Sequence, residues 1–465
     1  MYTTLRYAPA RPLFAAAVAA ESNVAFSAPF IPSPPSSSSS SSEQCLGDPA
    51  TMVATRLEAC ADHRDLARTH AHVLRFHLLR ASFHWNALIR CYLRLGRPRA
   101  SLSLYAQMCR SGATRDRYTL PLAVKAAALL FAFASGVQLH CTAVKLGLAC
   151  HEFTESGLIS LYAKAGLFGS AAKVFDQSAH RKLGSWNAII SGLTQGGRLR
   201  EAMNAFVELR RSGLVPDDVT MVTLASACGG LGDIDLAEQV HKCLLQAGRS
   251  GRLEVTLSNS LIDMYAKCGR TDLARKVFVR MSRRDVSSWT SMIMSLAVQG
   301  EESTALDVFQ EMQVDGVRPN QVTFVAVLSA CAHGGLVDEG MNYLEAMTKE
   351  FNLVPTVAHY GCIVDMLGKL GQLEQARTVV ETMPMEANAV VWGTLLGACE
   401  KHANVEVGEW AAKNLLDLEP WNDGVYVVLS NIYAEAKNWR EVERIRKLMK
   451  DRRVAKAPGY SSSST

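Results

Sequence analysis

The hydrophobic residues of this chain recur at the spacing of short amphipathic helices, most clearly in segment 183–217. A first apolar set falls on one face of a helix: Trp186, Ile189, Ile190 and Leu193. A second set follows: Ala202, Ala205, Phe206 and Leu209. Gly196 and Gly197 lie between the two sets, and Gly213 and Pro216 follow the second. The pattern therefore predicts two helices joined by a tight turn.

Three positions of this helical hairpin recur along the chain. The turn between the helices carries a glycine: Gly96, Gly166, Gly197, Gly269 and Gly300. The second helix carries an aromatic residue: Tyr105, Phe175, Phe206, Phe278 and Phe309. A small residue precedes it by four: Ser101, Ala171, Ala202, Ala274 and Ala305. We expect these positions to pack helices together and assign them no chemistry.

A longer period is marked by four related phrases, "HWNALI", "SWNAII", "SWTSMI" and "VWGTLL". Their tryptophans are separated by 101, 103 and 103 residues: Trp85, Trp186, Trp289 and Trp392. "LISLYAKAG" from Leu158 also returns as "LIDMYAKCG" from Leu261, so each long period holds three different units. Nine tandem units are expected over 82–388: 82–116, 117–151, 152–182, 183–217, 218–254, 255–285, 286–320, 321–356 and 357–388. We expect the tryptophans to be core residues rather than binding surface.

One hairpin of this length cannot bury its own apolar face, but a stack of hairpins can. The fold expected is therefore all-α, an α-solenoid superhelix of tandem helix-turn-helix repeats with a long concave surface.

Composition is compatible with a folded body, since hydrophobic residues make up 48% and charged residues 20%. The net charge of +5 permits a nucleic-acid partner without establishing one. The 12 cysteines include no C-x2-C pair, so we expect neither a zinc site nor a disulfide framework. The longest apolar run, Ala126–Ala134, is too short to span a bilayer.

Residues 1–45 have a different composition, with arginines, many alanines, a serine tract and few acids. This composition is typical of an organelle transit peptide, and a disordered tail is the alternative. The early Arg6 and Arg11 favour a mitochondrial over a chloroplast destination.

The alternation of 35, 35 and 31 residues, with "YAKCG", "WNAII…GLVPD" and "SACAHGGLVDEG", resembles the plant pentatricopeptide repeat (PPR) proteins of the PLS subclass. Residues 389–460 resemble the E1 and E2 motifs of that family, which are similar to tetratricopeptide (TPR) hairpins. Residues 46–81 resemble a degenerate first repeat, and 461–465 form a tail. The chain is thus similar to an E-type member without the DYW deaminase domain.

This resemblance implies single-stranded RNA binding, with one base read by the fifth and last residues of each unit. A short polar side chain can meet the Watson–Crick edge of an unpaired base, and Asn offers both a donor and an acceptor to uracil. Three pairs imply uracil: Asn86 with Asp116, Asn187 with Asp217, and Asn259 with Asp285. One pair implies adenine: Thr290 with Asn320.

Other units depart from this pattern. Two pairs leave the base open: Ser156 with Lys182, and Gly361 with Asn388. Two units carry fifth residues that cannot bond a base edge and are expected to act as spacers: Pro121 in 117–151 and Val222 in 218–254. The alternative is that these Asn and Asp residues are only helix caps or turn residues. Their recurrence in one register in three units favours base reading.

No catalytic site is expected, because the H-x-E and C-x-x-C set of a zinc deaminase is missing from the sequence. We expect no enzyme activity, no metal and no cofactor. The family resemblance implies a site-recognition factor for organelle C-to-U RNA editing. A DYW-type deaminase protein and other editing factors would then bind in trans through the E motifs, unless these motifs only cap the solenoid. Alternatives are transcript stabilisation, splicing or translation, and a TPR-like protein-binding scaffold. No membrane partner is expected.

Overall fold

The computed structural model describes residues 55–57, 59–75, 81–178, 181–246 and 255–452. The proposed transit segment 1–45 and tail 461–465 lie outside these residues. The described residues fall into two compact bodies, called here the N-terminal body (55–246) and the C-terminal body (255–452). All regular elements within them are helices.

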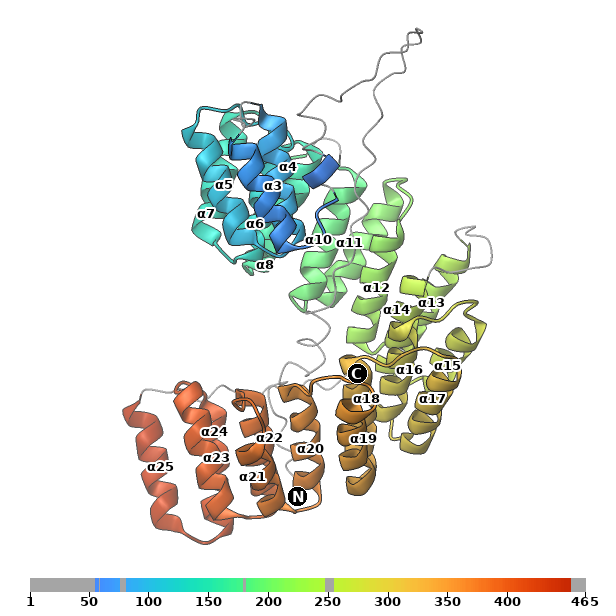
Figure 1. Cartoon of the computed structure of the whole chain (residues 1–465), viewed down its shortest axis with the longest axis vertical. Helices are drawn as coiled ribbons and strands as arrows, with labels where there is room; N and C mark the ends of the chain where they lie inside the picture. Colours follow the sequence, from blue (N-terminus) through green and yellow to red (C-terminus); the bar gives the residue numbers. More distant parts are fainter. Residues whose placement is uncertain (1–54, 58, 76–80, 179–180, 247–254, 453–465) are drawn as a thin grey trace. The chain divides into compact units, whose positions relative to one another are not determined.

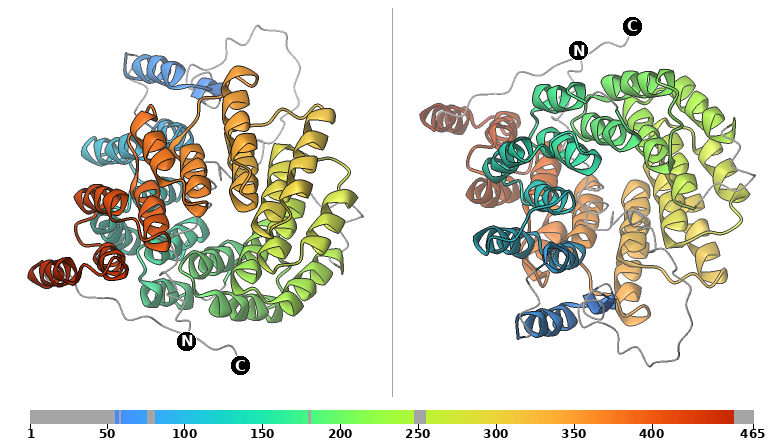
Figure 2. Two further views of the ribbon diagram at one scale, coloured as in Figure 1. Left: turned by 90° about the horizontal axis from the view of Figure 1, so that it is seen from below. Right: turned by 90° about the horizontal axis from the view of Figure 1, so that it is seen from above.

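The N-terminal body is drawn from blue to green in Figures 1 and 2. Its helices are α3 (His63–Arg75), α4 (Ser82–Arg94), α5 (Pro98–Arg110), α6 (Thr119–Leu129), α7 (Phe133–Lys145), α8 (Glu152–Lys164), α9 (Phe168–Asp176), α10 (Leu183–Gln195), α11 (Leu199–Arg211), α12 (Asp218–Leu231) and α13 (Ile234–Gln246).

The C-terminal body is drawn from yellow-green to red, with its helices side by side in Figure 1. They are α14 (Val255–Lys267), α15 (Thr271–Arg280), α16 (Val286–Val298), α17 (Glu302–Val314), α18 (Gln321–Gly334), α19 (Val337–Lys349), α20 (Val357–Lys369), α21 (Leu373–Thr382), α22 (Ala389–Lys401), α23 (Val405–Leu418), α24 (Asp423–Glu435) and α25 (Trp439–Asp451). No helix among the described residues is long and apolar enough to cross a membrane.

Each body consists of stacked helical hairpins in two layers. The first helix of a hairpin contacts its own second helix and also the first helix of the next hairpin, as α8 contacts α9 and α10. The same contacts link α16 with α17 and α18. The structure thus confirms the expected all-α repeat architecture within each body.

The core comes from the positions that the hydrophobic pattern marked. The tryptophans are 2–8% exposed: Trp85, Trp186, Trp289 and Trp392. The small residues of the second helices are fully buried: Ser101, Ala171, Ala202, Ala274 and Ala305. The tryptophans are therefore packing residues, as expected.

Backbone geometry explains two glycines of the repeat. Gly197, in the turn between α10 and α11, has a φ of 75°, a left-handed conformation that glycine adopts without a steric penalty. Gly192 allows α10 to approach α8 closely, because a Cβ atom on Gly192 would lie 2.4 Å from the Cβ atom of Ala163.

The second helices differ in length. Those of 152–182, 255–285 and 357–388 have 9, 10 and 10 residues, namely α9, α15 and α21. The units that follow 152–182 and 255–285 have longer second helices: α11 and α17 are 13 residues each. Beside the shorter helices, other side chains pack on the tryptophan of the next unit: Arg181 on Trp186, Arg284 on Trp289 and Trp410 on Trp392.

Candidate functional site

The last residue of several units caps the first helix of the next unit. Asp217, Asp285 and Asn320 each have an extended backbone, and their side chains accept the backbone N–H of the residue three positions later. The three N···O distances are 2.9, 2.8 and 2.9 Å. A short acceptor at this place satisfies one of the unpaired N–H groups of a helix start.

The third residue of the following unit completes this cap with its hydroxyl group. Thr220 Oγ1 donates to Asp217 Oδ1 at 2.8 Å and accepts the Asp217 N–H at 3.3 Å. Ser288 and Thr323 make the same pair of contacts with Asp285 and Asn320. These hydroxyl groups were not predicted, although the spacing of Asp or Asn to Thr or Ser is a capping-box signature in the sequence.

The fifth residue of each uracil-type unit reaches the unit's last residue from the first helix of the same unit. Asn86 Nδ2 lies 3.0 and 3.1 Å from the two carboxylate oxygens of Asp116. Asn187 and Asp217 repeat both distances. Asn259 Nδ2 donates to Asp285 Oδ1 at 3.2 Å. All three sequence-predicted Asn–Asp pairs are therefore in direct contact, and each carboxylate fixes the orientation of its amide.

The amide oxygens of these asparagines differ in their partners. Asn187 Oδ1 lies 2.6 Å from Thr220 Oγ1 and shares its single O–H with Asp217 Oδ1. Asn86 Oδ1 and Asn259 Oδ1 are buried and have no hydrogen-bond partner among the described residues. Asn86 as a whole is only 5% exposed. Buried acceptors are nearly always paired in folded proteins, so these two oxygens are exceptions within the described residues.

Asp116 stays ionised in this setting. Burial by itself raises the pKa of its carboxyl group, but donors from Tyr118, Thr119 and Asn86 outweigh this effect and leave the pKa below its usual value. A carboxylate is the form that accepts from the Asn amide.

The adenine-type pair is linked through a third residue. Thr290 Oγ1 lies 2.8 Å from Thr323 Oγ1, which donates to Asn320 Oδ1 at 3.0 Å. Thr290 is 7% exposed. A hydroxyl of the next unit bridges the fifth and last residues, as Thr220 does at Asn187, but here no direct contact between them accompanies the bridge.

The structure does not bring Ser156 and Lys182 together. Ser156 Oγ donates to the carbonyl of Phe153 in its own helix at 3.3 Å, and Lys182 Nζ pairs with Glu152 at 2.9 Å. The long cationic chain of Lys182 reaches the nearest carboxylate instead of the short serine. Asn388, paired in sequence with Gly361, only caps α22 through Val391 N at 3.1 Å.

Three exposed aromatic side chains were also missed. Phe83, Tyr118 and Phe153 are 56%, 45% and 39% exposed. They are the second residues of three successive units, three positions before the fifth residue; Phe83 and Phe153 lie in the first turns of α4 and α8, and Tyr118 directly precedes α6. Such faces can stack on unpaired bases. No group of three or more His, Cys, Asp and Glu residues that could hold a metal occurs in the described part of the chain.

Family comparisons match most of these units. The model for "PPR repeat" matches 83–112, 156–179, 257–286 and 322–350, and that for "PPR repeat family" matches 181–230 and 284–333. The "E motif" model matches 402–463.

Relatives share this family name. The chain is 51% identical to the mitochondrial pentatricopeptide repeat-containing protein At1g77170 of Arabidopsis thaliana over 92% of each chain. It is 37% identical to the chloroplastic protein CRR2 of the same plant, covering 82% of this chain and 58% of CRR2.

The solved structure of PPR10 from maize has 17% identity and a TM-score of 0.55, covering 87% of this chain and 63% of PPR10. PPR10 in complex with an 18-nt psaJ RNA element has a TM-score of 0.56 at 18% identity, over 86% and 64% of the two chains. At this identity the likeness concerns the fold.

Proposed function

The chain belongs to the pentatricopeptide repeat family, and from this premise we propose that it binds single-stranded organelle RNA and reads one base per unit. In this assignment 82–388 is the reading array, 46–81 a degenerate first repeat and 389–460 the E1 and E2 region. We further propose that it selects sites for C-to-U editing, with the deaminase bound in trans.

One observation carries the proposal of base reading. Three asparagines in the same register are each held by the carboxylate of an aspartate, and two of them keep a buried amide oxygen without a partner in the described residues. A residue that only capped a helix would not need an amide fixed in this way. A uracil N3–H is a donor of the right kind for that oxygen.

The bases follow from the pairs. Asn86 with Asp116, Asn187 with Asp217 and Asn259 with Asp285 read uracil, and Thr290 with Asn320 reads adenine. We assign no base to Ser156 with Lys182 or to Asn388. The track is then U, a spacer, an open base, U, a spacer, U and A, followed by two poorly specified bases, from 5′ to 3′. Phe83, Tyr118 and Phe153 add sequence-independent stacking.

Fluorescence anisotropy with purified protein tests this track. An RNA carrying the track is expected to bind at least tenfold more tightly than an RNA of the same composition in scrambled order. Binding of both is expected to weaken as salt rises, because phosphate contacts release counterions. Equal affinity for the two RNAs would contradict base reading.

The editing role rests on the match to the E motif at 402–463 and on the family resemblance that links this motif to editing. We place the protein in mitochondria because At1g77170 carries that location in its name, with the chloroplast of CRR2 as the alternative. In a loss-of-function plant, transcriptome sequencing is expected to show one or more C-to-U events lost downstream of a matching track. Changed transcript abundance or splicing with every edit intact would favour the alternative of a stabilisation or splicing factor.

A further inference from the structure

Two arginines of the chain cover the tryptophans that follow the short second helices. Arg181 and Arg284 are the penultimate residues of 152–182 and 255–285. The Arg181 guanidinium lies 4.5 Å from the ring centre of Phe175 and 6.0 Å from that of Trp186. The Arg284 guanidinium lies 4.7 Å from Phe278 and 5.7 Å from Trp289.

These arginines also bond the ends of the short helices. Arg181 Nε donates to the Phe175 carbonyl at 3.4 Å, and its Nη2 pairs with Asp176 at 2.7 Å. Arg284 Nε donates to the Phe278 carbonyl at 3.1 Å. A guanidinium thus stacks on aromatic rings and satisfies carbonyl groups that the helix end leaves unpaired.

The third junction of this kind lacks the arginine. Ala387 stands at the penultimate position of 357–388, and Val380 stands where the other units have Phe175 and Phe278. Trp392 keeps its place and is packed edge-on by Trp410, with ring centres 4.7 Å apart. Glu381 follows Val380 as Asp176 follows Phe175, so the carboxylate partner is retained.

An open groove of about 710 Å³ lies over Trp392. The corresponding space over Trp289, where Arg284 is present, measures about 460 Å³. The apolar lining of the larger groove includes Met383, Met385, Trp392, Trp410 and Leu418. Its acidic lining is Glu381, Glu386 and Asp417.

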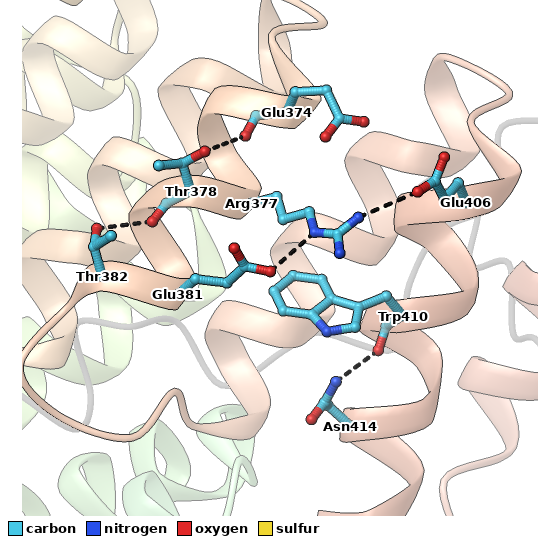
Figure 3. A network of polar contacts seen from close by, with 8 residues as sticks. All are labelled: Glu374, Arg377, Thr378, Glu381, Thr382, Glu406, Trp410 and Asn414. Carbon is cyan, nitrogen blue, oxygen red and sulfur yellow. Dashed lines mark hydrogen bonds and ion pairs between the residues drawn. The ribbon is translucent and has the colours of Figure 1, made fainter.

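Charge decides which class of partner suits this groove. Figure 3 shows Arg377 beside the ring of Trp410, between Glu381 and Glu406. The Arg377 guanidinium carbon lies 5.2 Å from the centre of the Trp410 ring. Its ion pairs with those two carboxylates measure 3.0 and 3.4 Å. Glu386 and Asp417 still line the groove, and their charge repels RNA phosphates and attracts a cation.

We propose that this groove binds an arginine side chain presented by a partner protein, on a short segment with an apolar residue beside it. The guanidinium lies over Trp392 and pairs with Glu386 and Asp417, the lining carboxylates that Arg377 does not contact, as Arg181 lies over Phe175 and Trp186 and pairs with Asp176 within the chain. The apolar neighbour lies against Met383 and Met385, whose flexible thioethers adapt to its shape. Arginine and aromatic residues are common anchors of protein interfaces.

Selection from a random peptide library displayed on phage tests this proposal, because the library samples arginine in every sequence context and requires no named partner. The full chain is the target, and the variant Ala387→Arg is used for counter-selection. Enriched peptides are expected to share one arginine next to an apolar residue. Peptides without a common arginine, or failure to enrich any peptide, would overturn the proposal.

Variants of the protein then locate the site of a selected peptide. Ala387→Arg places the chain's own guanidinium over Trp392, and is expected to weaken peptide binding at least tenfold. Val215→Arg, at an exposed position of the N-terminal body, adds the same charge and is expected to leave binding within twofold. Thermal unfolding followed by circular dichroism is the check that both variants are folded. Equal binding by the wild type and Ala387→Arg would refute the proposed site.

The peptide itself supplies a second measurement. Replacing its arginine with lysine keeps the charge but removes the planar fork, and is expected to weaken binding at least fivefold. Unchanged affinity of the lysine peptide would show that only charge attracts the segment and would contradict the stacked arrangement.

Discussion

Replacing Asn187 with alanine tests base reading at a single unit. The side-chain amide has two N–H groups, of which one is directed to Asp217, and two oxygen lone pairs, of which one accepts from Thr220. One donor and one acceptor remain. Uracil presents the complementary pair, the O4 acceptor and the N3–H donor.

The expected loss follows from these two bonds. At a net value of about 1 kcal/mol each, Asn187→Ala loses about 2 kcal/mol of binding energy, or about 30-fold in Kd, when uracil faces the unit. Adenine presents the reverse order, an N6–H donor where uracil has O4 and an N1 acceptor where uracil has N3–H, so an amide held in one orientation by Asp217 makes neither bond. The variant is then expected to change Kd by less than about twofold. The difference between the two losses measures the contact itself.

Anisotropy titrations of wild type and variant against two RNAs that differ only at this base give the four Kd values of a double-mutant cycle. Asn204→Ala, an exposed residue on α11 of the same hairpin, is the matched control and is expected to bind both RNAs like the wild type. Asp217 keeps its bonds to Thr220 in the variant, so the fold is expected to persist. If Asn187→Ala weakens both RNAs equally, the residue is structural and the reading hypothesis is wrong for this unit.

Three further variants test the supporting structure. Thr220→Val removes a hydroxyl that bonds both Asn187 and Asp217, and is expected to lower the free energy of unfolding in urea by about 1–2 kcal/mol; Thr223→Val on the same helix, whose hydroxyl bonds only a helix carbonyl, is expected to cost less than half as much. Gly192→Ala forces a contact with Ala163 and is expected to lower the melting temperature, whereas Gly184→Ala, with open space around the added Cβ, is expected not to lower it. Asp116 has a lowered pKa in the folded state, so its charge stabilises the fold above about pH 4 and this contribution disappears as the pH falls through the folded pKa. The difference in the free energy of unfolding in urea between the wild type and Asp116→Asn is therefore expected to decrease between pH 5 and 3. A constant difference would contradict an ionised Asp116 carboxylate.

The sequence could predict the features that depend on periodicity alone. The helical faces, the turn glycines and the buried tryptophans all follow from apolar spacing, because a stacked hairpin has only one way to hide its apolar stripe. The pairing of Asn187 with Asp217 followed from the family resemblance, which marks the fifth and last residues of one unit, and the structure places the two side chains in contact.

Other features needed coordinates because several partners compete for one side chain. Lys182 matches the register of a reading residue, yet it bonds Glu152, which its long chain reaches first. Thr154 and Ser185 occupy the same third position as Thr220, but follow His151 and Lys182 instead of Asp or Asn. Their hydroxyl groups have no partner among the described residues. The sequence marks the third position of each unit, but the residue three places earlier decides whether the hydroxyl there completes a helix cap.

Thr220 bonds Asn187 and Asp217 but belongs to the unit that follows theirs, and this placement bears on protein engineering. If a repeat transplanted into another protein ended at Asp217, the hydroxyl that bonds Asn187 and Asp217 would have to come from the host segment that follows. A recipient with Leu or Val there, as at Leu257 and Val391, would leave the imported amide without that contact. Recombination breakpoints are therefore best placed after Thr220, so that each specificity element travels with the first turn of its downstream neighbour.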